Sequence, residues 1–508
     1  MFRNPTRREF FGAAAGGAAL AATGGFGPQN RAVAAVAAGS SPVAKVPLET
    51  DIEPLVRVLE DTPRERLLEE IGARIRRGTT YREIVAALQL AGVRNVEPRP
   101  TVGFKFHSVL VVNSAHLASI SGLDRQRWLP IFWSLDYFKV TQAQDEREGD
   151  WTMAPVDEST VPDPQEAAER FRDSMERWDE GSADGAAAAL ARFPGAHQAF
   201  ELFAHYGGRD FRSIGHKVIF VASAWRALQC IGWQYAEPIL RSLAYALQNP
   251  TGDGNPAEHD YLADRPWRDN QQRVERIRDG WTLGRTDQAA TREMLQTLRS
   301  GSHEEVCELA VEQLNRGVSP QSLWDAIFAG SGELLMRQPG IVALHAGTTS
   351  NAMGYLFRTV RDERTRQLLL LQNLAFLPLF RGAMEGRGRV DDVQIDQLEP
   401  AEVEEDVREV AESIFADVPQ DRAAAARKTL ALVRRDPEAL AFVSAARQQV
   451  ALRARGSHDY KFSSAVLEDY LHVSPPWREC LLAASVYSLM GAGHSENPLV
   501  QRANEALA

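Results

Sequence analysis

The chain has 508 residues, of which 44% are hydrophobic, 25% charged and 8% aromatic, a balance typical of a soluble protein with a large core. Lys and Arg number 57 against 68 Asp and Glu, and the formal net charge is −11. Because no basic stripe interleaved with aromatic residues occurs, we expect no nucleic-acid partner. The three cysteines, Cys230, Cys307 and Cys480, lack CxxC spacing, which excludes a disulfide framework and a thiolate zinc site.

The first 38 residues resemble a twin-arginine export signal. Arg7 and Arg8 precede an apolar run at residues 12–22, and small residues at 32–37 offer an Ala-x-Ala cleavage site. The apolar run is shorter than the about 20 residues that span a bilayer, so we expect no stable membrane insertion. The resemblance implies that the twin-arginine translocation machinery carries the folded protein to the periplasm or the exterior, a route on which cofactors are common. The alternative is a disordered or membrane-anchoring N-terminus.

Beyond residue 50, apolar side chains recur at intervals of three and four residues, which predicts an all-α fold. Alternating strand patterns are nearly absent. Helices are predicted at residues 81–90, 129–140, 323–335, 365–380, 403–415 and 437–450. Loops rich in Pro, Gly or acidic residues are predicted at 145–164, 249–266 and 382–396. Because no flexible linker separates these blocks, we expect residues 50–508 to form a single all-α domain.

Internal similarity predicts that this domain is a helical bundle of about four degenerate multi-helix repeats. The Arg-Gly pair at residues 77–78 is echoed at residues 316–317, and a histidine follows each pair at nearly equal distance. The same frame of small and apolar residues fits two further histidines. The four histidines at this shared position are His107, His216, His345 and His458. A later apolar helix in each repeat carries a small polar residue: Ser134, Ser242, Asn373 and Ser485.

Each of the four histidines is expected near the start of the middle helix of its repeat. If the repeats pack around an axis, four imidazoles point at one centre, and neutral imidazole suits Fe, Zn, Cu or Ni. The sequence therefore predicts one metal ion at the centre of the bundle. The alternative is an inert histidine at each helix entry, bonded to the backbone.

Lys461 stands three residues after His458, on the same face of a helix. An ammonium beside a cation is repelled, so a lysine there must be deprotonated or chemically altered. Carboxylation by carbon dioxide would give a carbamate, whose anionic oxygen can serve a metal as Asp or Glu does in two-histidine, one-carboxylate iron sites. The alternative is an ordinary surface lysine.

The repeated helical chain, its spread histidines and the element His458-Asp459-Tyr460-Lys461 resemble the questin oxidase-like family, which includes Baeyer–Villiger-type and anthraquinone ring-cleaving oxygenases. For the ring-cleaving members, the resemblance implies a non-haem Fe(II) ion held by four histidines and a carboxylated lysine. It also implies dioxygen and a small organic, aromatic or quinone-like molecule as substrates. Carried over to this chain, the implied ligands are His107, His216, His345, His458 and Lys461. The chain departs from the family in its export signal and in lacking several paired histidines.

Other assignments remain open at the level of sequence. His197, Glu201 and His205 are spaced four and four, so they share one helical face and could themselves hold a metal. Two functions are alternatives to an exported iron oxygenase. One is a zinc-type hydrolytic metalloenzyme, and the other is a non-catalytic helical repeat scaffold that binds a protein partner through its acidic surface. Metal content and dioxygen uptake distinguish these three functions.

Overall fold

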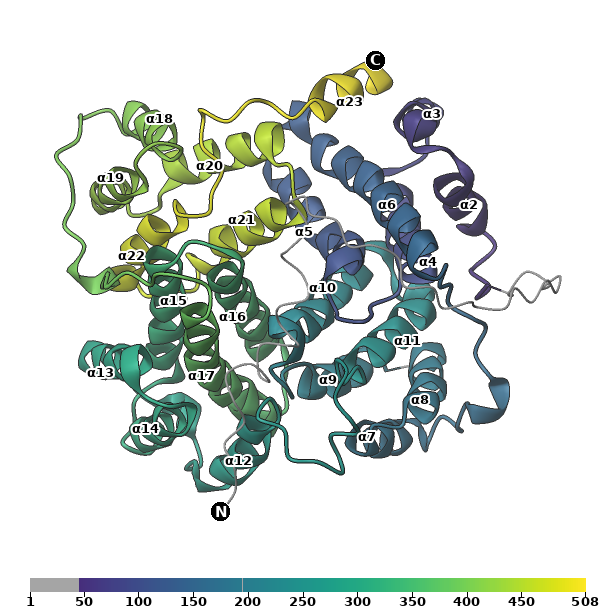
Figure 1. The fold of residues 1–508 in the computed structure, drawn as a ribbon, viewed down its shortest axis with the longest axis horizontal. Helices are drawn as coiled ribbons and strands as arrows, with labels where there is room; N and C mark the ends of the chain where they lie inside the picture. The colour runs from purple at the N-terminus through teal and green to yellow at the C-terminus, as the bar shows by residue number, and fades with distance from the viewer. Residues whose placement is uncertain (1–44, 194) are drawn as a thin grey trace, which may run out of the picture.

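The computed structural model describes residues 45–193 and 195–508, and they fold into an all-α structure (Figure 1). These residues contain 22 α-helices and one isolated bridge between Arg285 and Val318, but no strand. The predicted all-α fold is confirmed. The export signal predicted at residues 1–38 lies outside the described residues. None of the described helices is both long enough and apolar enough to cross a bilayer.

Four inner helices form a closed ring near the centre of Figure 1. They are α5 (His107–Ser121), α10 (His216–Ile231), α16 (Ile341–Thr359) and α21 (Ser457–Asp469). α5 packs against α10 and α21, and α16 packs against the same two helices. The order around the ring is therefore the order along the chain, and the last inner helix closes on the first.

Each inner helix packs against the helices that precede and follow it in the chain. The preceding helices are α4 (Tyr81–Asn95), α9 (Ala196–Gly207), α15 (Pro320–Arg337) and α20 (Leu440–Arg453). The following helices are α6 (Leu129–Glu148), α11 (Ala236–Leu247), α17 (Glu363–Glu385) and α22 (Pro475–Ser485). The small polar residue predicted in a later helix of each repeat is buried in α6, α11, α17 and α22, respectively. That the four units are copies of one repeat stays a prediction.

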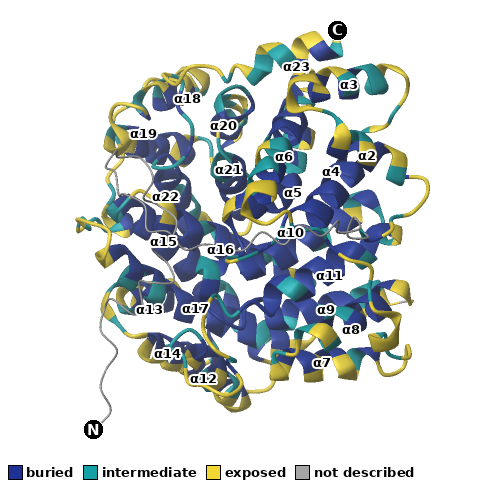
Figure 2. Cartoon of the chain, turned by 45° about the vertical axis from the view of Figure 1, so that its right-hand side comes forward, coloured by how far each residue is buried: buried dark blue, intermediate teal, exposed yellow. Residues whose placement is uncertain are grey.

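Shorter helices lie in pairs at the periphery, and exposed residues gather on them while the inner helices are mostly buried (Figure 2). The pairs are α7 (Ala167–Arg177) with α8 (Glu180–Arg192), α13 (Gln288–Ser300) with α14 (His303–Asn315), and α18 (Val407–Asp417) with α19 (Arg422–Arg435). The consecutive helices α2 (Glu53–Asp61) and α3 (Arg64–Arg76) pack on α4 and α6 instead. α12 (Arg265–Arg273) and α23 (Leu499–Leu507) stand outside this pattern. The periphery thus shields the ring from solvent.

The predicted helices correspond to α4, α6, α15, α17, α18 and α20, with differences at their ends. The segment predicted from residue 403 becomes helical only at Val407, because the Asp406 carboxylate caps the helix by accepting backbone N–H groups. The segment predicted from residue 437 becomes helical at Leu440. The loops predicted from residues 145 and 382 begin late, since α6 and α17 continue to Glu148 and Glu385. Each cysteine is a free thiol in the described structure, as expected.

Candidate metal centre

Four histidine side chains meet at one end of the inner ring. One ring nitrogen from each of His107, His216, His345 and His458 lies within 4.8 Å of the others. His107 and His216 begin α5 and α10, while His345 and His458 lie in the first turn or two of α16 and α21. The predicted convergence of the four rings is confirmed. All four inner helices therefore begin near this cluster and lead away from it.

Backbone carbonyls fix three of the four rings. The Nδ1 atoms of His107, His216 and His345 lie 2.7, 2.6 and 2.6 Å from the carbonyl oxygens of Phe104, Ser213 and Ile341. A carbonyl oxygen can only accept a hydrogen bond, so each Nδ1 carries the ring proton and donates its N–H to the carbonyl. In the neutral ring the lone pair is then at Nε2, the atom that faces the cluster. These rings are therefore set up as ligands through Nε2.

The distances between these Nε2 atoms match those between neighbouring ligands of a metal. The Nε2 atoms of His107 and His216 are 3.1 Å apart, and those of His216 and His345 are 3.0 Å apart. Two unprotonated nitrogens cannot hydrogen-bond to each other, so each pair is repulsive in the absence of a cation. Two nitrogens bound at about 2.1 Å and at a right angle would lie about 3.0 Å apart. One ion between the rings satisfies this geometry.

α21 supplies His458 to the cluster, and Lys461 of the same helix lies near enough for its charge to lower the pKa of all four rings. The ring of His458 lies 4.6 Å from that of His107 and 5.0 Å from that of His345, between centroids. Its Nε2 and the Nζ of Lys461 are buried and have no hydrogen-bond partner among the described residues. Leaving a buried polar atom unpaired costs about 1–3 kcal/mol. A metal ion would supply the missing partner of His458 Nε2, and carboxylation would turn the unpaired amine of Lys461 into a carbamate whose oxygen could bind the same ion.

Burial lowers the pKa of every titratable group in the cluster. It lowers the pKa of His458 to about 3 and those of the other three imidazoles well below the ordinary value, with the charge of Lys461 as the second cause. Burial alone lowers the pKa of Lys461 to about 7. The four rings are neutral at pH 7, which is the form that binds metal. A neutral amine is likewise the form of lysine that reacts with carbon dioxide.

Unusual backbone turns place His107 and His216. Phe104, Ser213 and Ile214 have φ values of 43°, 54° and 44°, a left-handed conformation that costs a non-glycine residue of order 1–3 kcal/mol. Gly215 follows with φ of 82°, and a Cβ atom there would lie 2.0 Å from the Thr349 hydroxyl oxygen. These turns direct the carbonyl oxygens of Phe104 and Ser213 at the rings of His107 and His216. The sequence did not predict the turns, because of these four residues only Gly215 favours such a conformation.

The alternative trio on α9 does not form a site. His197 Nε2 lies 3.0 Å from Glu201 Oε1, whereas His205 Nδ1 lies 3.0 Å from the Thr365 hydroxyl. Glu201 also accepts the backbone N–H of Arg361. Within residues 45–193 and 195–508, the histidine cluster is the group of metal-ligating side chains that converges. The trio serves the packing of α9 instead.

Comparison of the chain with protein-family models, with curated proteins and with solved structures gives no match. The family resemblance drawn from the sequence therefore stays a prediction.

Proposed function

We propose that this protein is a non-haem iron oxygenase that acts on a small organic molecule. The observation that carries the proposal is that the Nε2 atom of His216 lies 3.1 Å from that of His107 and 3.0 Å from that of His345, while all three rings already donate Nδ1–H to the backbone. Histidines that merely fill a core satisfy both ring nitrogens. Here one nitrogen of each ring is satisfied and the other is presented to a shared centre.

The donor set favours iron over zinc. Four imidazoles and a carbamate on Lys461 make five ligands, whereas zinc takes four in structural sites and three plus a water in catalytic sites. Histidine nitrogen and an anionic oxygen are also the donors of non-haem Fe(II) oxygenases. The carbamate offsets part of the metal charge, which four neutral rings cannot do. An Fe(II) ion held by His107, His216, His345, His458 and Lys461 would supply the activation of dioxygen.

The chain itself orients the ligands and keeps the centre dry. The carbonyl oxygens of Phe104, Ser213 and Ile341 hold the rings in one tautomer and make the Nε2 atoms more basic. His107, His216 and His345 are at most 6% exposed, so little water reaches them. A dry site strengthens every electrostatic interaction within it.

Apolar side chains at the histidine end of the ring favour an apolar substrate. Phe104 and Ile341, whose carbonyls bind the rings of His107 and His345, have side chains that are 47% and 36% exposed. Ligand-binding sites are lined mainly by hydrophobic and aromatic side chains. We infer that a small aromatic or quinone-like molecule contacts these two side chains.

We also propose export of the folded protein by the twin-arginine translocation machinery to the periplasm or the exterior. This proposal rests on Arg7, Arg8 and the apolar run that follows them. Transport in the folded state would preserve a metal centre that was assembled before export.

Elemental analysis of protein purified without chelator tests the proposed function. Stoichiometric iron, and dioxygen uptake that depends on an added quinone or phenol, is the expected result. Zinc at the same ligands without dioxygen uptake would contradict the oxygenase and favour a hydrolase. Protein that binds no metal at all would favour a non-catalytic scaffold.

A further inference from the structure

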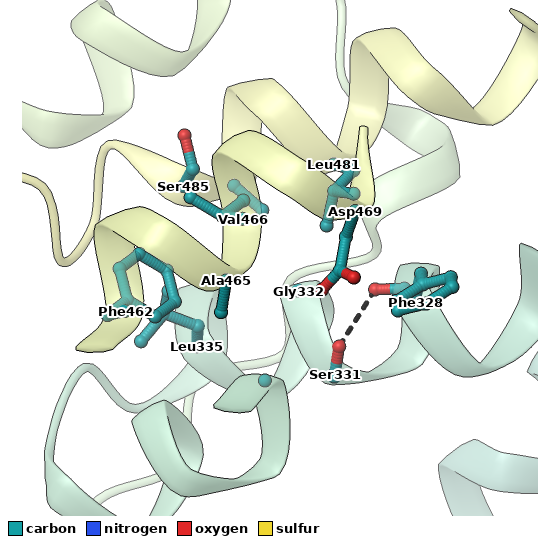
Figure 3. Close-up of a pocket in the computed structure, with 12 residues that line it drawn as sticks. Phe328, Ser331, Gly332, Leu335, Phe462, Ala465, Val466, Asp469, Leu481 and Ser485 are labelled. Carbon is teal, nitrogen blue, oxygen red and sulfur yellow. Dashed lines mark hydrogen bonds between the residues drawn. The ribbon is translucent and has the colours of Figure 1, made fainter. Parts of the chain in front are cut away.

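A small cavity lies between α15, α16, α21 and α22 (Figure 3). Its lining is mostly apolar and includes Phe328, Leu335, Phe462, Ala465, Val466 and Leu481. All of these side chains are buried. The cavity has room for little more than a water-sized molecule.

The polar groups in the lining are already paired or neutral. Ser331 donates its hydroxyl to a carbonyl of its own helix, shown by the dashed line in Figure 3, and Ser485 does the same. Asp469 accepts a hydrogen bond from Asn351, and burial raises the pKa of its carboxyl to about 8. An ordered water needs two to four polar partners, and this lining offers few. The cavity therefore suits a small apolar molecule better than water.

The cavity and the histidine cluster share the wall formed by α16 and α21. Gly347 lines the cavity two residues after His345, and Phe462 lines it directly after Lys461. A Cβ atom at Gly347 would lie 3.4 Å from the ring of Phe462. Because position 347 has no side chain, the Phe462 ring is the bulky group where these two helices meet.

We propose that this cavity binds dioxygen and delivers it to the metal centre between α16 and α21, past Gly347 and Phe462. Delivery rests on the proposed oxygenase function, whereas binding rests on the cavity alone. Dioxygen is small and apolar, so transfer from water into a dry apolar space is favourable. Larger apolar cavities stay dry and take up xenon, so this small apolar atom is a probe of the space that needs no metal.

Xenon pressurisation of crystals of the full chain tests the binding step. A xenon atom is expected beside Phe328, Leu335 and Ala465, in metal-free and in iron-loaded protein alike. Ala465→Leu fills the space and should abolish the xenon peak. An ordered water bonded to Asp469 at this position, with no xenon, would overturn the inference.

Dioxygen kinetics of iron-loaded variants test the delivery step. Gly347→Ala adds a Cβ atom in ordinary van der Waals contact with the Phe462 ring and so narrows the proposed path of dioxygen. A Cβ atom at Gly382 of α17 meets no described atom within 4 Å. Alanine also favours a helix over glycine, so both variants should fold and hold iron. Gly347→Ala should raise KM for dioxygen several-fold at unchanged kcat, and Gly382→Ala should change neither.

The outcomes separate this inference from the proposed function. If xenon binds but neither Gly347→Ala nor Ala465→Leu changes KM for dioxygen, delivery through this wall is wrong while the oxygenase stands. If iron-loaded protein takes up no dioxygen with any quinone or phenol, the proposed function and the delivery of dioxygen to the metal centre are both wrong. The binding of xenon in the cavity is unaffected by that result.

Discussion

The Nε2 atoms of His107 and His216 lie 3.1 Å apart, although each ring already donates its Nδ1–H to a backbone carbonyl. Two buried acceptors that face each other have lost water and gained no partner, which raises the free energy of the folded state. A cation between them removes this cost. Metal binding should therefore stabilise the fold as well as equip it for chemistry.

Replacing His345 by Ala should remove the metal and leave the helices intact. His345 is 1% exposed and its Nε2 lies 3.0 Å from that of His216, so it belongs to the centre of the cluster. The loss of metal affinity should exceed the roughly 10–100-fold lost when a residue that merely orients a ligand is removed. Elemental analysis and circular dichroism measure the two effects. His494→Ala is the matched control, since that ring bonds within a local turn to Gly491; equal metal content in both variants would contradict the site.

Lys461→Met should separate the roles of the amine in folding and in metal binding. Nζ of Lys461 is buried without a partner in the described part of the chain, so its removal should stabilise the metal-free protein by about 1 kcal/mol or more. The same variant should lose most of its metal if the lysine binds as a carbamate, and bicarbonate should not restore it. Lys461→Glu should recover part of the metal, because it restores the charge with a shorter reach.

The control for Lys461→Met is Lys428→Met. The amine of Lys428 lies 2.7 Å from the carboxylate of Asp417 at the surface. That variant should change neither the metal content nor, by more than about 1 kcal/mol, the stability. Full metal occupancy in Lys461→Met, together with density for an unmodified amine in the wild type, would refute the ligand role.

Gly215→Ala should damage the centre through the backbone. Position 215 has φ of 82°, and the added Cβ atom would collide with Thr349 next to His216. We expect a loss of stability of more than about 1 kcal/mol and a loss of metal affinity. Gly388→Ala isolates the backbone effect, because φ there is 117° and the Cβ atom would meet no described atom within 4 Å. Equal metal affinity in the two variants, measured by titration, would show that the turn does not position His216.

Asp469 should give the metal-free protein a pH-dependent stability. Burial, followed by the charge of Glu468, raises the pKa of Asp469 from 3.8 to about 8. Between about pH 4 and pH 8 the folded state holds a proton that the unfolded state releases, so this group lowers the free energy of unfolding as pH rises. Asp469→Asn should reduce that fall by more than about 1.4 kcal/mol, the equivalent of one pKa unit.

Urea unfolding at pH 5 and pH 8 measures the effect of Asp469→Asn. Asp173→Asn, at an exposed position of α7, is the control for the removal of one carboxyl group. If Asp469→Asn and the wild type lose the same stability between the two pH values, the carboxyl of Asp469 is ionised in the folded protein.

Replacing Arg7 and Arg8 by Lys should hold the protein in the cytoplasm, because the arginine pair is the part of the signal that the translocation machinery reads. Cell fractionation of the tagged full chain measures the distribution. A periplasmic or secreted fraction equal to that of the wild type would show that another route, or none, acts on this segment.

The histidine cluster could be predicted because histidine is rare, at 11 of 508 residues, and recurs at one place in a frame of small and apolar residues. The turns that orient His107 and His216 could not, since Phe104 and Ile214 adopt a φ that bulky residues avoid. Only the contacts made by the whole fold hold them there. The cavity beside Ala465 could not be predicted from the sequence either, because it depends on how side chains from four helices fill the space between them.

The proposed ligands are spread from His107 to Lys461, and the ring of inner helices exists only when α21 has closed on α5. A growing chain on the ribosome lacks the centre until nearly all of its residues have emerged. Under the proposed function, a metal would therefore be acquired late, by a finished polypeptide in the compartment where folding ends. If the chain crosses the membrane already folded, the cytoplasmic metal pool determines which ion it carries, whatever ions are abundant at its destination.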